Sequence, residues 1–509
     1  MPGLGSNVGR MALTWTIPGP ARELREQAHR LGPLKVEVSQ ASPAEIEADL
    51  VVAGLYEDGS LPEHLADAGG AGDARGGYRK LAVLHPQGGG RALVVGLGKR
   101  EEMDAERARV AAALAAKRAG ELEAASVAWL MPESDDDGAI AEGIVTGTLL
   151  GAYRFDRFKS ADPDEPAPPG IASLTLLGPE AVAEAAEAAR ICAEAQNRAR
   201  DLQSLPSNVA TPSYLGRRAR EVASHHENVT TEVFGRDWLA EKEMGGILAV
   251  SRGSAEEPQL IVMRYAGGGD GPTLGLVGKG VTFDTGGISI KPSSGMHEMK
   301  MDMSGAAAVL EAVTAIAELG LAVDLVAVIP STENMPSGTA VKPGDVITQY
   351  GGKTVEVNNT DAEGRLILAD ALAYAVELGA ERIVDLATLT GAVLIALGST
   401  YAAVISNDDE LAAEVESAGK ASGELVWRLP LHQEFKALMK GTVADLSNLA
   451  SKRKAGTITA AAFLEEFVGD TPWAHVDIAG TAWDVGREYT GNDASGYSVR
   501  LLVGVASRM

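Results

Sequence analysis

The sequence predicts an α/β protein of two domains, each a mostly parallel sheet flanked by helices. Short apolar runs alternate with Ala-rich stretches of helical periodicity along the chain, which is the pattern of α/β proteins. The apolar runs are typical of strands buried on both faces, as in parallel sheets. A chain of 509 residues is too long for a single hydrophobic core, so at least two domains are expected.

The first domain is expected to cover residues 1–178. Its strands are predicted at 50–55, 92–96 and 173–177, and its helices at 101–118 and 140–153. The segment ADPDEPAPPG at 161–170 contains four prolines and three acidic residues, a composition typical of a linker. A long Ala/Glu-rich helix follows, and we expect it to link the two domains over residues 179–203.

The second domain is expected to cover residues 204–509. Its strands are predicted at 259–265, 274–277, 323–329, 383–386 and 474–478, and its helices at 304–319, 364–378, 409–422 and 459–468. The helix at 364–378 is apolar nearly all round, so it should be buried.

The composition argues against some classes of binding partner and favours one kind of cellular compartment. The chain has 45 basic and 70 acidic side chains, a formal net charge of −25, which argues against nucleic acids and anionic membranes as partners. Its single cysteine, Cys192, allows no intrachain disulfide and favours a reducing compartment. Residues 1–30 lack the pattern of a signal peptide. The uncharged stretch 386–407 is long enough to span a bilayer, but its seven Thr, Ser and Gly residues favour a buried strand, turn and helix.

Two segments place charged residues where charge is costly. In the first, Lys279 follows an apolar strand, and Asp284, Lys291 and Asp302 come after it. Ligands of open α/β sheets bind at the carboxyl ends of strands, so these side chains are candidate site residues.

The second segment, NNTDAEGRL at 358–366, contains Asp361, Glu363 and Arg365. Because Asp361 and Glu363 are two residues apart, an extended backbone would point both carboxylates to one side. With Asp284 and Asp302 they carry a charge of −4, which two divalent cations would balance, and hard oxygen ligands suit Mg²⁺, Mn²⁺ or Zn²⁺. Helix capping and salt bridges would explain the same spacing, and the pattern alone leaves both interpretations open.

Longer motifs resemble those of the leucyl aminopeptidase family, whose members are cytosolic dinuclear metallo-exopeptidases. NTDAEGRL at 359–366 is similar to the family signature, and the resemblance extends from about residue 153 to the C-terminus. The other matching segments are RFDRFKS (154–160), VGKGVTFDTGG (277–287), SIKPSSGMHEMKMDMSGAAAV (289–309), DLATLTGA (385–392), VADLSN (443–448) and AHVDIAGTAW (474–483).

The resemblance implies a role for each site residue. The metal ligands it implies are Lys279, Asp284, Asp302, Asp361 and Glu363. It makes Lys291 and Arg365 catalytic, with Arg365 holding a bicarbonate ion that shuttles a proton. The pocket for the first side chain of the substrate resembles one lined by Met299, Thr388, Gly391 and Ala479.

The function that the resemblance implies is a cytoplasmic aminopeptidase. It would release leucine and other apolar N-terminal residues from peptides, using two divalent metal ions, Mn²⁺ or Zn²⁺, and bicarbonate. The family also implies a homohexamer. A DNA-binding regulator and a catalytically inactive binding protein are the alternatives; the acidic charge argues against the first, and the complete set of site residues argues against the second.

Overall fold

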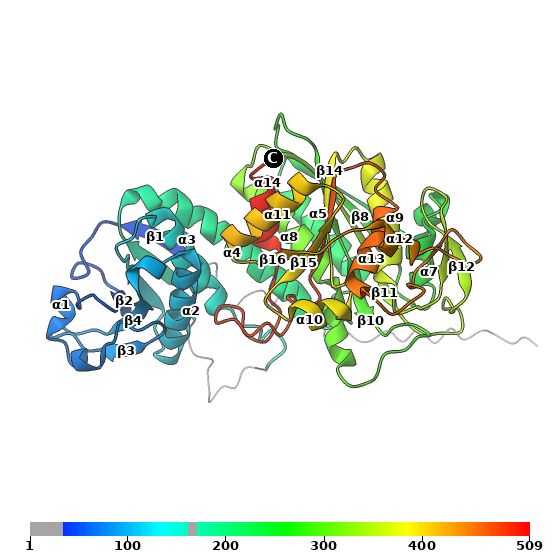
Figure 1. Cartoon of the computed structure of the whole chain (residues 1–509). Helices are drawn as coiled ribbons and strands as arrows, with labels where there is room; N and C mark the ends of the chain where they lie inside the picture. The colour runs from blue at the N-terminus through cyan, green and yellow to red at the C-terminus, as the bar shows by residue number, and fades with distance from the viewer. Residues whose placement is uncertain (1–33, 161–169) are drawn as a thin grey trace, which may run out of the picture.

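The chain forms two lobes, each built on its own sheet (Figure 1). The computed structural model describes residues 34–160 and 170–509. The predicted linker at 161–170, apart from Gly170, and the segment 1–30 lie outside the described residues.

The smaller lobe contains a six-stranded sheet. All neighbouring strands in it are parallel except β3 and β4, which pair antiparallel at one edge. In spatial order the strands are β1 (Lys35–Ser39), β6 (Ser173–Leu177), β5 (Ser126–Leu130), β2 (Leu50–Tyr56), β4 (Ala92–Gly98) and β3 (Leu81–Leu84). The helices of this lobe are α1 (Glu63–Ala66), α2 (Ala105–Glu121) and α3 (Asp137–Gly151). The alanines of α2 let it pack closely against α3.

The larger lobe contains a nine-stranded mixed sheet. Its strands in spatial order are β16 (Val426–Arg428), β15 (Ala402–Ser406), β18 (Trp473–Asp477), β14 (Arg382–Ala387), β9 (Leu274–Gly278), β11 (Asp324–Asn334), β8 (Gln259–Ala266) and β7 (Val229–Phe234), with β10 (Gly280–Asp284) paired to β11. The central neighbours β18, β14, β9 and β11 are parallel. A separate small sheet contains β12 (Asp345–Thr348), β13 (Thr354–Val357) and β17 (Leu446–Ser447).

Helices cover both faces of the large sheet. One layer contains α5 (Pro212–His225), α8 (Ser304–Leu319), α11 (Asp409–Ser422) and α14 (Val499–Ala506), and the opposite layer contains α6 (Arg236–Glu241), α7 (Gly245–Ser251), α9 (Gly364–Glu377) and α13 (Gly456–Glu465). Along β9, Leu276 packs into the first layer and Val277 into the second. Because apolar side chains leave both faces of the central strands, the strands are apolar at consecutive positions, as predicted.

The structure confirms the predicted fold class, two α/β lobes with mostly parallel sheets. The strand at 173–177 and the helices at 304–319 and 409–422 have the predicted bounds. The uncharged stretch 386–407 forms the end of β14, α10 (Gly391–Leu397) and β15, and no helix of the described residues is long and apolar enough to cross a membrane.

Helix α4 (Ala183–Ser204) lies between the two lobes (Figure 1). It packs against α3 of the smaller lobe and against α8 of the larger one. The predicted domain limits at 178 and 204 stay a prediction.

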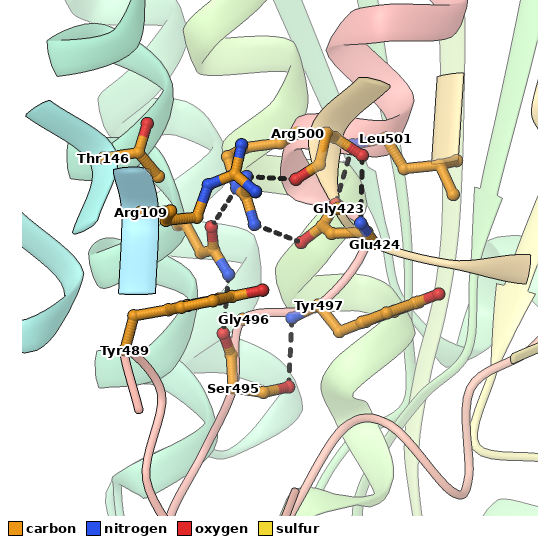
Figure 2. Close-up of polar contacts among 12 residues, drawn as sticks. Arg109, Thr146, Gly423, Glu424, Tyr489, Ser495, Gly496, Tyr497, Arg500 and Leu501 are labelled. Atoms are coloured by element: carbon orange, nitrogen blue, oxygen red, sulfur yellow. Dashed lines mark hydrogen bonds and ion pairs between the residues drawn. The ribbon is translucent and has the colours of Figure 1, made fainter. Parts of the chain in front are cut away.

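Beside α4, a polar junction joins the lobes (Figure 2). Arg109 of α2 is completely buried and pairs with Glu106 and with Glu142 of α3, the latter at 2.8 Å. Tyr489, from the segment after β18, donates a hydrogen bond to Glu106 at 3.1 Å, and its ring centroid lies 5.8 Å from the Arg109 guanidinium. The buried positive charge therefore has two carboxylate partners and an aromatic ring around it.

Candidate functional site

Polar side chains gather at the carboxyl ends of the central parallel strands. Lys279 directly follows β9, and Asp284 ends β10. Asp302 lies in a 3₁₀ segment, η4 (Met296–Met303), just before α8. Asp361 and Glu363 lie between β13 and α9. The structure therefore brings the two charged segments of the sequence to one edge of the large sheet.

Lys279 is the centre of one half of the cluster. Its side chain is only 3% exposed, and its Nζ lies 2.8 Å from Asp302 Oδ2 and 2.8 Å from Glu363 Oε1. The same Nζ donates a hydrogen bond to the backbone oxygen of Thr388 at 3.0 Å. Gly364 is required beside it, because a Cβ there would lie 2.6 Å from Lys279 Cε.

Lys291 is the centre of the other half. Its Nζ lies 2.8 Å from Asp284 Oδ2 and also pairs with Asp361. Carboxylate oxygens of Asp284, Asp361 and Glu363 all lie within 4.8 Å of one another. Asp302 is not one of these three residues. It is linked to Glu363 because both carboxylates pair with Lys279. The side chain of Lys291 stays 22% exposed, so a bound molecule can reach it.

The backbone around Asp361 is a turn, and the expectation of an extended segment there is wrong. The turn covers 360–361, and Glu363 already has helical dihedral angles as the residue capping α9. The carboxylates meet because the chain folds back, not because a strand alternates.

Asn448 holds this turn in place. Its side-chain amide donates to the backbone oxygens of Asn359 and Ala362 at 2.6 and 3.3 Å, and its side-chain oxygen accepts from the Asn358 backbone at 2.8 Å.

Burial and neighbouring charges shift the pKa values of the cluster. Burial and the nearby Glu363 raise the pKa of Asp284 to about 6, and burial raises the pKa of Asp302 to about 8. Burial also acts upward on Glu363, but Lys279 and Lys291 outweigh it and hold the pKa of Glu363 below its usual value. The carboxylates raise the pKa of both lysines despite burial. Asp284 and Asp302 therefore take up a proton more readily than exposed carboxyl groups do.

Arg365 enters the cluster from the first turn of α9. Its Nη1 donates to the backbone oxygen of Asn448 at 2.8 Å, whereas its buried Nε has no hydrogen-bond partner among the described residues. Burial lowers the pKa of Arg365 to about 10, so the side chain stays positively charged at neutral pH. A buried guanidinium with a free donor suits a small anion.

The predicted pocket residues lie on loops beside the cluster. The Thr388 hydroxyl donates to Asp302 Oδ1 at 2.7 Å, so this side chain is already part of the charged network. Gly391 is exposed at the start of α10, Ala479 is half-buried after β18, and Met299 is half-buried in η4. The backbone of Ala479 donates to Asp477 Oδ1 at 3.3 Å, so Ala479 also contacts a carboxylate.

Three supporting residues were not among the predicted site residues. Asn334 donates to Asp284 Oδ1 at 2.8 Å and to the backbone oxygen of Thr360 at 3.0 Å. Asp477 accepts from the Thr390 hydroxyl at 2.6 Å and from the backbone of Leu389 at 3.1 Å, and so holds the loop after β14. Asn448 and Asp477 both lie inside the motifs VADLSN and AHVDIAGTAW, so the sequence contained a signal for them.

Divalent metal ions fit this set of donors. The four carboxylates are buried or half-buried, and three of them converge within 4.8 Å. Four carboxylates face only two ammonium groups, and carboxylate oxygens are the ligands that Mg²⁺ and Mn²⁺ prefer. An arrangement of this kind is costly unless cations balance it.

Comparisons with known proteins identify the family of the chain. The family model described as "Cytosol aminopeptidase family, N-terminal domain" matches residues 47–162, and the one described as "Cytosol aminopeptidase family, catalytic domain" matches residues 197–503. A probable cytosol aminopeptidase of Roseiflexus castenholzii is 47% identical over 483 residues, which is 92% of this chain and 98% of that protein. One from Geobacter sp. strain M21 is 44% identical, with 92% and 99% of the two chains covered.

Solved structures show the same architecture. The bottromycin maturation enzyme BotP in complex with Mn has a TM-score of 0.83 and 34% identity, covering 91% of this chain and 99% of that one. A tomato leucine aminopeptidase mutant has a TM-score of 0.84 and 31% identity, covering 95% and 98%.

Proposed function

The chain belongs to the cytosol aminopeptidase family and so is a metal-dependent aminopeptidase, and on that premise we propose that it releases leucine and other apolar residues from the N-terminus of peptides. The observation that supports the proposal most directly is the convergence of Asp284, Asp361 and Glu363 beside two lysines at the strand ends.

We propose that two divalent ions, Mn²⁺ or Zn²⁺, are held by Lys279, Asp284, Asp302, Asp361 and Glu363. When bound, paired ions lower the pKa of a water molecule and supply the nucleophile for hydrolysis. Lys279 can act as a ligand only as a neutral amine. The carboxylates raise its pKa, and dications placed among them act in the opposite direction, so ion binding would release its proton.

Lys291 is the proposed electrophile. It is the more exposed of the two lysines, with 22% of its side chain accessible against 3% for Lys279. Its ammonium group would donate to the carbonyl oxygen of the bond being cleaved and stabilise the negative charge that develops there. Asp284 and Asp361 hold the ammonium group in position for this contact.

Arg365 is the proposed holder of bicarbonate. An arginine with a pKa of about 10 cannot accept a proton at neutral pH, so an anion bound to it must do so. The free Nε of Arg365 and the planar guanidinium suit a planar carbonate group.

The proposed pocket for the first side chain is lined by Met299, Thr388, Gly391 and Ala479. Gly391 leaves open space, since a Cβ there would meet nothing within 4 Å. Methionine and small residues around such a space favour an apolar side chain. We also propose a homohexamer, a cytoplasmic location and peptides with a free N-terminus as substrates, with neither membranes nor nucleic acids as partners.

The test is a peptidase assay on metal-stripped enzyme that is resupplied in turn with Mn²⁺, Zn²⁺, Mg²⁺ or Co²⁺. Leucine amide and leucine peptides should be hydrolysed only after metal is added, and the same peptides with an acetylated N-terminus should be resistant. Hydrolysis of the acetylated peptides would contradict an aminopeptidase, and full activity after removal of metal would contradict the metal site.

A further inference from the structure

The loop between β17 and α13 contains three consecutive cations in a strongly acidic chain. Lys452, Arg453 and Lys454 are all exposed, and none of them forms an ion pair with another described residue. From Leu446 to Leu464 the chain has no acidic residue, although its net charge is −25. These unpaired charges are available to a bound molecule.

Both ends of this loop are attached to the proposed site. At its start, Asn448 accepts a hydrogen bond from Arg365 at 2.8 Å and holds the turn at Asn359. At its end, the Thr457 hydroxyl lies 2.9 Å from the Thr390 hydroxyl, and a Cβ on Gly456 would lie 3.0 Å from the Ala392 Cβ. The three cations therefore lie on a segment that connects Asn448, which contacts Arg365, with the loop before α10.

The length of the segment allows the loop to lie within reach of a short peptide. Lys452 follows Asn448 by four residues, which span at most about 14 Å. A tripeptide cleaved after its first residue places its terminal carboxylate about 7 Å beyond the cleaved bond. Cations act on such a group over roughly 8 Å at physiological ionic strength.

We infer that the loop formed by Lys452, Arg453 and Lys454 binds a substrate carboxylate about two residues beyond the cleaved bond, so that the enzyme favours short peptides with a free C-terminus. The inference rests on the proposed aminopeptidase function and defines its substrate class further. Such a substrate has one positive and one negative terminus, so the net charge of −25 disfavours only its carboxylate end, and a local positive loop offsets that effect at the site.

The test compares Leu-Gly-Gly with its C-terminal amide on the Mn²⁺-loaded enzyme. We expect kcat/KM to be about fivefold higher for the acid, mainly through KM, and the ratio to fall as salt is added. In the variant with Lys452→Gln, Arg453→Gln and Lys454→Gln, the ratio should fall to about one. A matched variant, Lys80→Gln, Lys99→Gln and Lys117→Gln, removes the same charge from exposed residues of the smaller lobe and should keep the ratio.

The outcomes separate this inference from the proposed function. Hydrolysis of acid and amide with equal kcat/KM, or a ratio that survives the triple substitution in the loop, would overturn the inference alone. No hydrolysis of either peptide would overturn the aminopeptidase function and the inference with it. Inhibition by duplex DNA that the loop substitutions abolish would assign the loop to a polyanion and overturn the inference. Leu-Gly-Asp-amide identifies the source of the carboxylate: a rate equal to that of the acid indicates a side chain, and a lower rate indicates the chain terminus.

Discussion

The cluster at the strand ends and the junction between the lobes both bury charge, but they balance it differently. At the junction, Arg109 has Glu106 and Glu142 as partners. It lies beside the ring of Tyr489 (Figure 2). Close by, Arg500 donates to Gln196 at 2.7 Å and to the Ser422 backbone. In the cluster, four carboxylates share only Lys279 and Lys291.

The difference distinguishes charged groups that stabilise the fold from charged groups of the proposed site. Each arginine of the junction has protein partners, Glu106 and Glu142 for Arg109 and Gln196 and the Ser422 backbone for Arg500, although Arg109 Nε itself has none. These contacts contribute to holding the lobes together. In the cluster four carboxyl groups have only two lysines as partners, and burial raises the pKa of Asp284 and Asp302. Substitutions in the cluster should therefore change chemistry, and substitutions in the junction should change stability.

The largest effect is expected from Glu363→Gln. The change removes the charge of a proposed ligand in the cluster, so kcat/KM should fall by at least about a thousandfold and metal content should drop. Elemental analysis and circular dichroism would measure metal and fold. The matched control is Glu311→Gln, since Glu311 is also fully buried but is paired with Arg198 and Arg218. It should lower stability and leave metal content unchanged; equal metal content in both variants would contradict the assignment of Glu363.

A smaller effect is expected from Lys291→Ala. If Lys291 acts on the developing oxyanion, kcat should fall by about 10²–10³ while both ions stay bound. Steady-state kinetics and elemental analysis on the same preparation would measure the two quantities. Lys342→Ala, at an exposed lysine, serves as the control. Loss of metal in Lys291→Ala would mean that the lysine supports the ligands and is not catalytic.

Arg365→Ala should lower the rate by about 10²-fold and remove its dependence on bicarbonate. The variant should keep both proposed ions, because a positively charged guanidinium cannot be a metal ligand. Activity would be followed in carbonate-free buffer and during titration with bicarbonate. A wild-type rate that does not respond to carbonate would leave Arg365 with a bracing role on Asn448.

The smallest effect is expected in the junction. Glu142→Gln leaves the buried Arg109 with one charged partner and should cost about 1–2 kcal/mol of unfolding free energy, discounted because the Glu142 side chain is 30% exposed. Its kcat/KM should stay within about twofold of wild type, a difference of roughly 0.4 kcal/mol in barrier height. Denaturant titration would measure stability. In the control Glu187→Gln the lost pair with Arg190 is more exposed, and the change should be under about 0.5 kcal/mol.

Sequence reasoning identified local elements better than it identified what supports the site. The helix at 409–422 was predicted to the residue, because Asp408 caps its start and Gly423 ends it with φ of 73°. The strand at 35–39 was missed, since it lies at a sheet edge and is only partly buried. Capping residues and apolar periodicity can be recognised in the local sequence, whereas a partly buried edge strand has only a weak pattern.

The site shows the same limit. The charged residues of the motifs were found, but the turn that joins Asp361 to Glu363 depends on Asn448, some 85 residues later in the chain. Asn334 and Asp477 likewise act at the ends of strands that become neighbours of the site only in the folded sheet. Hydrogen bonds between distant segments leave no periodic pattern in the sequence.

Helix α4 has a thermodynamic consequence. Its side chains reach both lobes: Asn197 donates to the Leu149 backbone of the smaller lobe at 3.1 Å, and Arg198 pairs with Glu311 of the larger lobe at 2.8 Å. A helix shared in this way cannot unravel without removing packing from both sheets at once. Calorimetry should therefore record one melting transition for the described body of the chain, and the amides of α4 should be among the slowest to exchange with deuterium.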